Sequence, residues 1–506
     1  MSGPPPPAAP RLGQRVALAS LYAILQRAIL RGIGLVSTVI LARLLTPEDF
    51  GIIGVAAVVQ TALEGLTSTG FGLALIRMRE PQRVHYDTAF TLTVLRGLVV
   101  AGGIAGTSWW QAAFMGEPRV APVMWVMALT ALIQSLESIR MFDLQRDLRF
   151  DTLLRYHVLQ KLAGFAAVIP LAFWLRSYWA LVLASALGRL LSIPLSYRLA
   201  PHRPRFALGA WREFFNFSKW LFLGNISAII HQQMMNLVIG RFQGMEAVGL
   251  YQIAYQIAAL PISEIAAPLG QPAYAGFARV RHARGELVRY VLAGLALQWL
   301  VILPLSAGVA LTAREVTLVF LGDRWTGLVP LMPIVAMFAL FDALAGYLAN
   351  LFIVLDRQAR MVLTGYGVML LRLGSVVYAA DRHGLIGAAW AMLGAACLNF
   401  ALWQAMAGRL LGQRPEWTLG ALWRPALAAA LMTGAVLAIP ADAALRLHLP
   451  WPIAATLGVK AAAGAAVYLG VTLALWQASG RPGQSAESHL ARLAGGALAR
   501  FTRRAA

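Results

Sequence analysis

Long apolar runs alternate with short polar segments from residue 17 to residue 477. A helix needs about 20 mainly apolar residues to cross the hydrocarbon core of a bilayer, and the chain contains about fourteen runs of this kind. The pattern predicts an all-α integral membrane protein. The predicted spans are 17–42, 51–75, 88–110, 120–139, 156–175, 177–197, 216–240, 247–275, 288–311, 328–354, 361–380, 384–407, 421–440 and 452–477.

The arginines between the spans cluster in every second connecting segment, for example in residues 77–83 and 279–289. Cytoplasmic loops of membrane proteins carry the excess of Lys and Arg. This alternation places both termini in the cytoplasm. We expect residues 1–15 to form a disordered cytoplasmic tail and residues 481–506 to form a basic cytoplasmic tail.

The composition narrows the class of protein. Of the 506 residues 59% are hydrophobic and only 13% are charged, whereas about 25% of the residues of a soluble domain are charged. The net charge of +21 is spread over small clusters, which argues against a nucleic-acid partner. The single Cys397 excludes an internal disulfide and a thiolate metal cluster. The chain has no GxxxxGK(S/T) loop, HExxH or GxSxG, so we expect no enzymatic activity, metal or bound cofactor.

An internal repeat organises the spans. Residues 39–59 align with residues 237–257 without a gap, although any two membrane hairpins share some of these features. The repeat predicts two parallel six-helix lobes, 16–205 and 206–412, facing each other across a cleft, with two further helices in residues 413–480. The aligned identities are Arg43 with Arg241, Glu48 with Glu246, Gly51 with Gly249 and Ala56 with Ala254.

Arginines occur in the middle of the apolar runs. Arg27 and Arg31 lie four residues apart in the first span, so they share one face of that helix, and Arg96 lies at similar depth in the third span. An ionised side chain at the bilayer centre costs about 2.5 to 3.5 kcal/mol on insertion scales. Mid-depth cations outnumber anions, so pairing does not account for all of them. We predict that these three arginines bind the phosphates of a substrate in a watery cavity, because the planar guanidinium suits phosphate.

Other polar residues within the spans are candidates for lining the same cavity. The carboxylates could instead form structural pairs with the arginines of the first span. Helix packing or contact with lipid head groups remains open for the two arginines in the set, and the histidine is either an interior hydrogen-bonded residue or a sugar contact. The candidates are Glu64, Arg189, His231, Asn236, Asp342 and Arg372.

Glycine and proline interrupt one corresponding span of each predicted lobe. Gly65 and Gly70 lie in the second span, and Pro261 and Pro268 in the eighth. Broken helices at corresponding positions of a transporter point to its central site, so we predict hinges at these four residues. The alternative is the general tolerance of membrane helices for both residue types.

Four segments resemble a known family. The stretches LARLLTPEDFGIIGVAAVV, RMREPQ, VFLGDRWTGLVPLMPI and LFIVLDRQAR are similar to the Wzx-type polysaccharide transport family of the MOP superfamily, which is related to MATE drug exporters and lipid II flippases. The resemblance covers roughly residues 15 to 480. It implies that undecaprenyl-diphosphate-linked oligosaccharide repeat units are flipped across the bacterial inner membrane, by alternating access, for exopolysaccharide, O-antigen or capsule assembly. The resemblance also implies an arginine-rich central cavity. The positions of Arg27 and Arg31 in the first span match the expected position of that cavity.

The resemblance leaves several questions open. A polysaccharide polymerase and glycosyltransferases are the implied protein partners, and Glu64 is a candidate for coupling to a proton or a sodium ion. The strongest rival is a MATE-like exporter of cationic drugs, which would need a net acidic cavity. A non-transporting scaffold is a second rival. An integral glycosyltransferase is disfavoured, because the longest outside loop offers only Arg314, Glu315, Asp323 and Arg324 as charged groups.

Overall fold

The computed structural model describes residues 12–67, 71–78, 80–414, 416–440, 452–480 and 488. Within these ranges the side chains of residues 12–17, 73, 214–232, 267–272, 275, 358–359 and 421 are not described. Several predictions therefore fall outside the described residues. They are the tails 1–15 and 481–506 (apart from residues 12–15, whose backbone is helical, and Ser488), the hinge residue Gly70, and the side chains of His231 and Pro268.

The described chain is helical throughout its ordered elements, which confirms the predicted all-α membrane fold. Nine of its helices are long and apolar enough to cross a membrane, and Val120–Ser135 and Leu422–Leu437 are shorter apolar helices. Each predicted span corresponds to a helix or to one arm of a kinked helix, except the second, 51–75, which is divided between Pro47–Leu66 and Phe71–Arg77. Contacts within the chain group it into two compact units, Met1–Gly249 and Leu250–Ala506. The lobe boundary at residue 205 stays a prediction.

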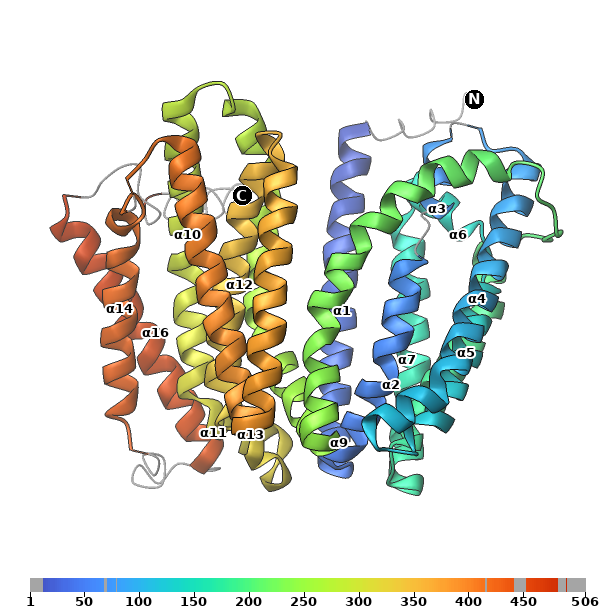
Figure 1. Ribbon diagram of the computed structural model, residues 1–506, viewed down its shortest axis with the longest axis horizontal. Coiled ribbons are helices and arrows are strands. Elements are labelled where there is room, and N and C mark those ends of the chain that lie inside the picture. The colour runs from blue at the N-terminus through green and yellow to red at the C-terminus, as the bar shows by residue number, and fades with distance from the viewer. Residues whose placement is uncertain are drawn as a thin grey trace, which may run out of the picture. The chain divides into compact units, whose positions relative to one another are not determined.

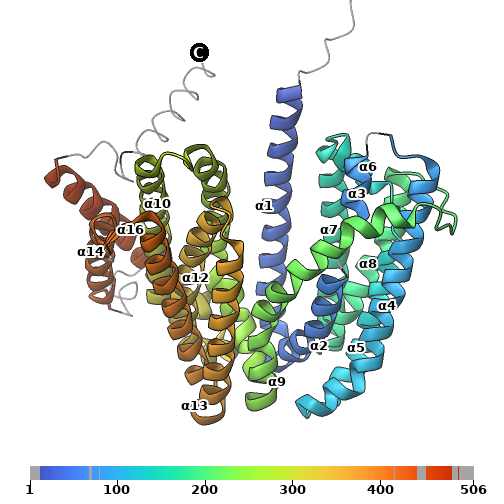
Figure 2. The same ribbon diagram turned by 45° about the horizontal axis from the view of Figure 1, so that its top comes forward.

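The first unit is built from parallel and antiparallel helices that pack in neighbouring pairs. Helices α4 and α5 lie side by side (Figures 1 and 2), as do α7 and α8, and α1 packs against α7. The elements are α1 (Leu12–Leu44), α2 (Pro47–Leu66), α3 (Phe71–Arg77), α4 (Arg83–Met115), α5 (Val120–Ser135), α6 (Met141–Arg146), α7 (Phe150–Leu175), α8 (Trp179–Leu199) and the beginning of α9 (Trp211–Val280).

The second unit contains the end of α9 and the remaining helices. Helix α12 packs between α10 and α13, and α14 and α16 lie together at the edge of the unit, against α10 (Figure 1). The elements are α10 (Arg284–Leu311), α11 (Ala313–Val316), a π-helical turn (Thr317–Leu321), a 3-10 helix (Asp323–Leu328), α12 (Leu331–Val354), α13 (Gln358–Leu411), α14 (Leu419–Leu437) and α16 (Pro452–Ala478).

Two predicted loops are single glycine kinks. The sequence separates spans seven and eight, and spans eleven and twelve, by short turns. In the structure α9 runs through the first turn with only Gly244 outside helical geometry (φ 82°), and α13 runs through the second with only Gly384 (φ 66°). A positive φ is accessible to glycine without the steric cost that a Cβ atom imposes. One glycine is therefore enough to redirect each chain from one span into the next.

The two copies of the repeat cross each other at their glycines. A Cβ atom placed on Gly51 would lie 1.8 Å from the carbonyl oxygen of Met245, and one placed on Gly249 would lie 1.8 Å from the carbonyl oxygen of Pro47. In the repeat alignment Gly51 corresponds to Gly249 and Pro47 to Met245. The contact is therefore reciprocal, as a local two-fold relation between the two hairpins requires. Only residues without a Cβ permit this approach of the two backbones.

A capping box starts α2 at this crossing. The Thr46 amide donates to Asp49 Oδ2 at 2.9 Å, and the Asp49 amide donates to Thr46 Oγ1 at 3.3 Å, with Pro47 in the first turn. The other carboxylate oxygen of Asp49 accepts a hydrogen bond of 2.9 Å from the Tyr178 amide, between α7 and α8. The carboxylate therefore caps one helix and also holds the turn between two others.

Removing this carboxylate is the first testable change. Asp49→Ala should lower the free energy of unfolding by about 2 kcal/mol, the upper end for a lost N-cap interaction, because the Tyr178 contact is lost as well. Thr46→Ser keeps a hydroxyl at the cap and serves as the control. The unfolding midpoints of both variants are measured in the same detergent. Equal midpoints would show that the cap contributes nothing.

A charged cluster follows α4 at the same end of the unit. Arg119 Nε donates to Glu117 Oε1 at 2.7 Å, and the Arg119 guanidinium also forms an ion pair with Glu48. The hydrogen bond from the Arg119 side chain holds the pKa of Glu117 below its ordinary value. The stabilising effect of this hydrogen bond is therefore present near neutral pH and is lost as the pH falls through the lowered pKa.

At the opposite end, the segment that joins α8 to α9 is tied to α4 through polar side chains. The Arg205 amide donates to Asp87 Oδ1 at 3.2 Å, and the Ala207 amide donates to Thr91 Oγ1 at 2.9 Å. Asp87 is buried, and its carboxylate oxygens lie 3.6 Å from Arg83 Nε and 3.6 Å from the imidazole Nε2 of His202. These contacts fix the segment between α8 and α9 against α4.

A buried ion pair attaches the last helix to the second unit. Lys460 Nζ, in the first half of α16, lies 2.6 Å from Glu315 Oε1 in α11, and both side chains are largely buried. The Tyr468 hydroxyl donates to the Leu300 carbonyl at 2.7 Å. Glu315 comes from the loop that the sequence assigns to the outside, yet it is only 4% exposed. Polar contacts as well as apolar packing therefore hold α16 in place.

Candidate functional site

Three cavities open within the first unit, between α1, α4, α5, α7 and α8. One of about 470 Å³ contains both arginines of the first predicted span. A second, of about 400 Å³, lies between α1, α7 and α8. A third, of about 270 Å³, lies mainly between α4, α5 and α7. The volumes of the first two cavities are in the range of small-molecule binding sites, and the third lies slightly below that range.

Arg27 and Arg31 lie together in the first cavity. Both side chains are exposed, and they border the cavity with Gln26, Leu30 and Phe150. Arg27 and Arg31 are separated by one helical turn near the midpoint of α1, so their guanidinium groups project from the same face. No carboxylate is among the described residues that line this cavity. The structure thus brings together two of the three arginines predicted to bind phosphate.

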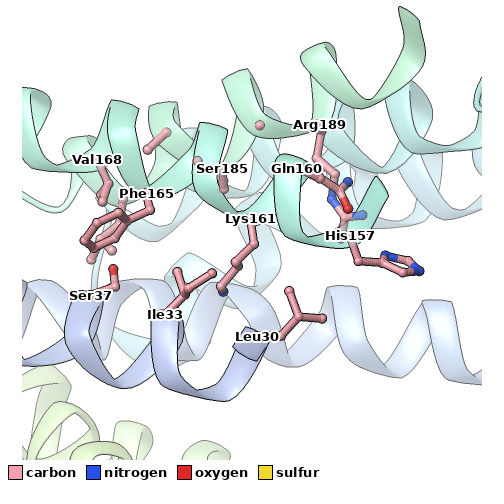
Figure 3. Close-up of a pocket in the computed structure, with 14 residues that line it drawn as sticks. Leu30, Ile33, Ser37, His157, Gln160, Lys161, Phe165, Val168, Ser185 and Arg189 are labelled. Atoms are coloured by element: carbon pink, nitrogen blue, oxygen red, sulfur yellow. The ribbon is translucent and has the colours of Figure 1, made fainter. Parts of the chain in front are cut away.

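The second cavity adds two cations on neighbouring helices. Lys161 in α7 and Arg189 in α8 line it, each near the middle of its helix. Figure 3 shows Lys161 pointing from α7 towards α1, where Leu30 and Ile33 form the facing wall. Leu30 borders the first cavity too, so the two cavities adjoin along α1.

The close packing of α7 and α8 forms the base of the second cavity. A Cβ atom on Gly188 would lie 3.5 Å from the Cα atom of Gly164, so these two glycines face each other across the helices. Both line the cavity, and neither has a side chain that fills it. The remaining wall is apolar at one end, at Phe165 and Val168, and polar at the other, at Gln160.

Arg96 lies in the third cavity, apart from the other two predicted phosphate ligands. Its guanidinium donates to Thr67 Oγ1 at 3.1 Å and to the Glu64 carbonyl at 3.0 Å, at the C-terminal end of α2. Cations at this end of a helix are stabilised by the unpaired carbonyl groups. The Glu64 carboxylate also borders this cavity and accepts a 2.8 Å hydrogen bond from Gln60. Phosphate binding by Arg96 stays a prediction, in a different place from Arg27 and Arg31.

Both carboxylates that line the three cavities belong to the third one. They are Glu64 and Glu137, and Glu137 accepts a 2.6 Å hydrogen bond from the Ser192 hydroxyl of α8. His157 borders both the second and the third cavity, with Glu137, Gln160 and Arg189 as its polar neighbours. Carboxylates therefore line only the third cavity, where Arg96 also lies, and His157 borders both this cavity and the second one.

The remaining sequence candidates lie elsewhere in the chain. Arg372 is only 6% exposed and its guanidinium lies 4.8 Å from the centre of the Phe338 ring, which fits the helix-packing alternative. Asp342 is half-buried, and Tyr255 lies close to both it and Arg372. Asn236 donates to a neighbouring glutamine within α9 at 3.3 Å. None of these lines one of the three described cavities.

The predicted hinges have different local structures. Helix α2 ends at Leu66, directly after Gly65, and α3 begins at Phe71, so the second predicted span is divided between two helices. Pro261 lies inside α9, whose only non-helical residue is Gly244. Motion at any of these positions stays a prediction.

Sequence reasoning missed Lys161. It lies in the predicted span 156–175, three to four residues from His157, Gly164 and Phe165 on the same helical face. A charge at mid-depth on a face with glycine and histidine is a signal that could have identified it. All of the mid-depth cations named from the sequence were arginines.

Helices of membrane-spanning length, arranged in two helical units with cation-lined cavities in the first, define a multi-pass membrane protein. The chain belongs to a family of proteins described as "Polysaccharide biosynthesis protein", whose sequence model matches residues 40–330. The resemblance found in the sequence is thereby confirmed.

Curated relatives carry names from the same area of biology. The chain is 21% identical to the lipopolysaccharide biosynthesis protein WzxC of Escherichia coli, over 78% of this chain and 82% of the relative. It is 24% identical to the teichuronic acid biosynthesis protein TuaB of Bacillus subtilis, over 79% and 83%. It is 22% identical to the succinoglycan biosynthesis transport protein ExoT of Rhizobium meliloti, over 60% and 62%.

Solved structures share the fold. The lipid II flippase MurJ, in an inward closed conformation, matches with a TM-score of 0.72 at 12% identity, over 91% of this chain and 99% of MurJ. An inward-facing MATE family transporter matches with a TM-score of 0.54 at 16% identity, over 75% and 94%. At these identities the likeness establishes the fold alone.

Proposed function

We propose that the protein translocates a polyprenyl-diphosphate-linked oligosaccharide across the bacterial inner membrane. The observation that carries the proposal is the Arg27–Arg31 cavity, in which two mid-membrane cations share a space lined by no described carboxylate. A diphosphate between a lipid and a sugar carries two negative charges, which match the two guanidinium groups. Family membership and the relatives named for lipopolysaccharide, teichuronic acid and succinoglycan biosynthesis support this substrate class.

The proposed cycle follows from charge and polarity. The diphosphate binds Arg27 and Arg31, the sugars occupy the watery cavities, and the polyprenyl chain stays in lipid. Alternating access of the two units then moves the head group outward. With both termini in the cytoplasm, the membrane potential favours the movement by about 2.3 kcal/mol per negative charge per 100 mV, reduced by any arginine charge that moves with it.

The cycle needs no bound cofactor. A polymerase and glycosyltransferases are its proposed partners, and a proton or sodium ion is a candidate for coupling.

The test removes the two arginines in a flippase-deficient strain. Arg27→Ala with Arg31→Ala should abolish complementation of surface polysaccharide, because no paired guanidinium groups remain to receive the diphosphate. Protein levels in the membrane should stay unchanged, since both side chains are exposed. Arg155→Ala with Arg198→Ala is the matched control, because it removes two exposed arginines of α7 and α8 that line none of the three cavities.

Two outcomes would contradict the proposal. Normal surface polysaccharide in the Arg27→Ala, Arg31→Ala variant would exclude these residues from transport. Resistance to cationic drugs on overexpression, lost in Glu64→Gln and kept in the arginine variant, would instead favour the MATE-like exporter.

A further inference from the structure

The second cavity contains more positive charge than the proposed diphosphate site requires. Lys161 and Arg189 line it, and no carboxylate is among its described lining residues. Neither cation forms an ion pair with any described residue of the chain. Both lie near the midpoints of their helices, where an uncompensated charge is costly unless it faces water or a counter-ion. The cavity therefore provides a place for a second anionic group.

We propose that the α1–α7–α8 cavity binds an acidic sugar of the carried oligosaccharide, with its carboxylate between Lys161 and Arg189. This inference rests on the proposed function and specifies its substrate class as an anionic, uronate-type saccharide. The two cavities adjoin at Leu30. A sugar near the diphosphate in the chain therefore reaches the second cavity while the diphosphate occupies the first.

The rest of the cavity has the chemistry that a sugar ring needs. Gln160, Ser37 and Ser185 offer amide and hydroxyl groups to sugar hydroxyls, and Phe165 offers an aromatic surface to the apolar face of the ring. The facing glycines Gly164 and Gly188 leave the space open. A neutral sugar would satisfy the polar groups, but it would leave both cations without a counter-charge.

The carboxylates of the protein do not take this role. Glu64 and Glu137 line the third cavity, and Glu137 is engaged by Ser192 at 2.6 Å. Glu137 is close enough to interact electrostatically with His157, which borders both cavities. It nevertheless does not line the second cavity, where Lys161 and Arg189 remain available.

Two probes that differ in one functional group test the inference. Purified protein in nanodiscs is titrated with a polyprenyl-diphosphate disaccharide bearing a hexuronic acid, and with the same molecule in which the acid is reduced to the alcohol. The wild type should bind the acidic probe about tenfold or more tightly than the neutral probe, which is the range for hydrogen bonds to charged groups.

Lys161→Gln and Arg189→Gln should each reduce that preference to about threefold or less, with the affinity for the neutral probe unchanged. Lys161→Arg should retain the preference. The control Arg155→Gln removes a charge from α7 outside the cavity and should also retain it.

The outcomes separate this inference from the proposed function. Equal binding of both probes by the wild type would overturn the acidic-sugar site and leave the diphosphate site standing. Equal weakening of both probes by Lys161→Gln would show that Lys161 serves the diphosphate, which also overturns the inference. If neither probe binds the wild type, both the inference and the proposed function are wrong.

Discussion

The Gly51→Ala variant is expected to unfold at a markedly lower temperature than the wild type. The new Cβ atom would lie 1.8 Å from the Met245 carbonyl oxygen, a backbone atom that has no rotamer by which to move away. The two helices must separate at their crossing. Overpacking of a well-packed site costs about 1 to 3 kcal/mol and occasionally more, and we expect the upper end here. The measurement is the unfolding midpoint in detergent, with the amount of protein in the membrane as a second readout.

Two further results are expected because the contact between the two glycines is reciprocal. Gly249→Ala should have a similar effect, and the double variant should cost less than the sum of the single ones, because both act on one crossing. Gly102→Ala is the control, since Gly102 lies in α4 with open space around it and alanine is favoured over glycine in a helix by about 1 kcal/mol. A Gly51→Ala protein as stable as Gly102→Ala would contradict the crossing.

Lys460→Met is expected to destabilise the attachment of α16 to the second unit. It leaves the Glu315 carboxylate buried without its cation, 2.6 Å from where the ammonium group was. Removing one partner of a buried ion pair costs about 3 to 5 kcal/mol. Limited proteolysis of the α14 and α16 region and the unfolding midpoint measure the effect. Cleavage should increase before the rest of the chain unfolds.

Replacing both partners distinguishes the pair from simple packing. Glu315→Met with Lys460→Met should recover most of the lost stability, because no charge is then left buried. Arg314→Gln removes the neighbouring exposed charge and should leave the midpoint unchanged. A double variant as unstable as Lys460→Met alone would show that the carboxylate is not the cause.

The positions of the helices were predictable because the hydrocarbon core of a bilayer allows few backbone structures other than the helix. Backbone groups in hydrocarbon must be paired within the segment, so about 20 apolar residues become a helix. The kinks at Gly244 and Gly384 appeared in the sequence as loops, because hydropathy reports where a span ends and not how the chain turns. The repeat alignment matched Gly51 with Gly249, yet the contact between the two copies depends on how the hairpins cross.

The candidate site was only partly predictable. Arg27 and Arg31 were recognised because their spacing of four residues places them on one face whatever the rest of the fold does. Arg96 lies at similar depth, but its helix turns it towards the end of α2. Lys161 was overlooked, although it lines the cavity next to the two arginines.

The sequence by itself determined that this chain is a helical membrane protein, where its helices lie and that the middles of its apolar runs carry more cations than anions. These properties follow from local composition and periodicity. Only the tertiary structure decided which charges share a cavity and which are paired, as Lys460 is with Glu315. Depth along a helix is set by sequence position, whereas the neighbour at that depth depends on the rotation and packing of other helices.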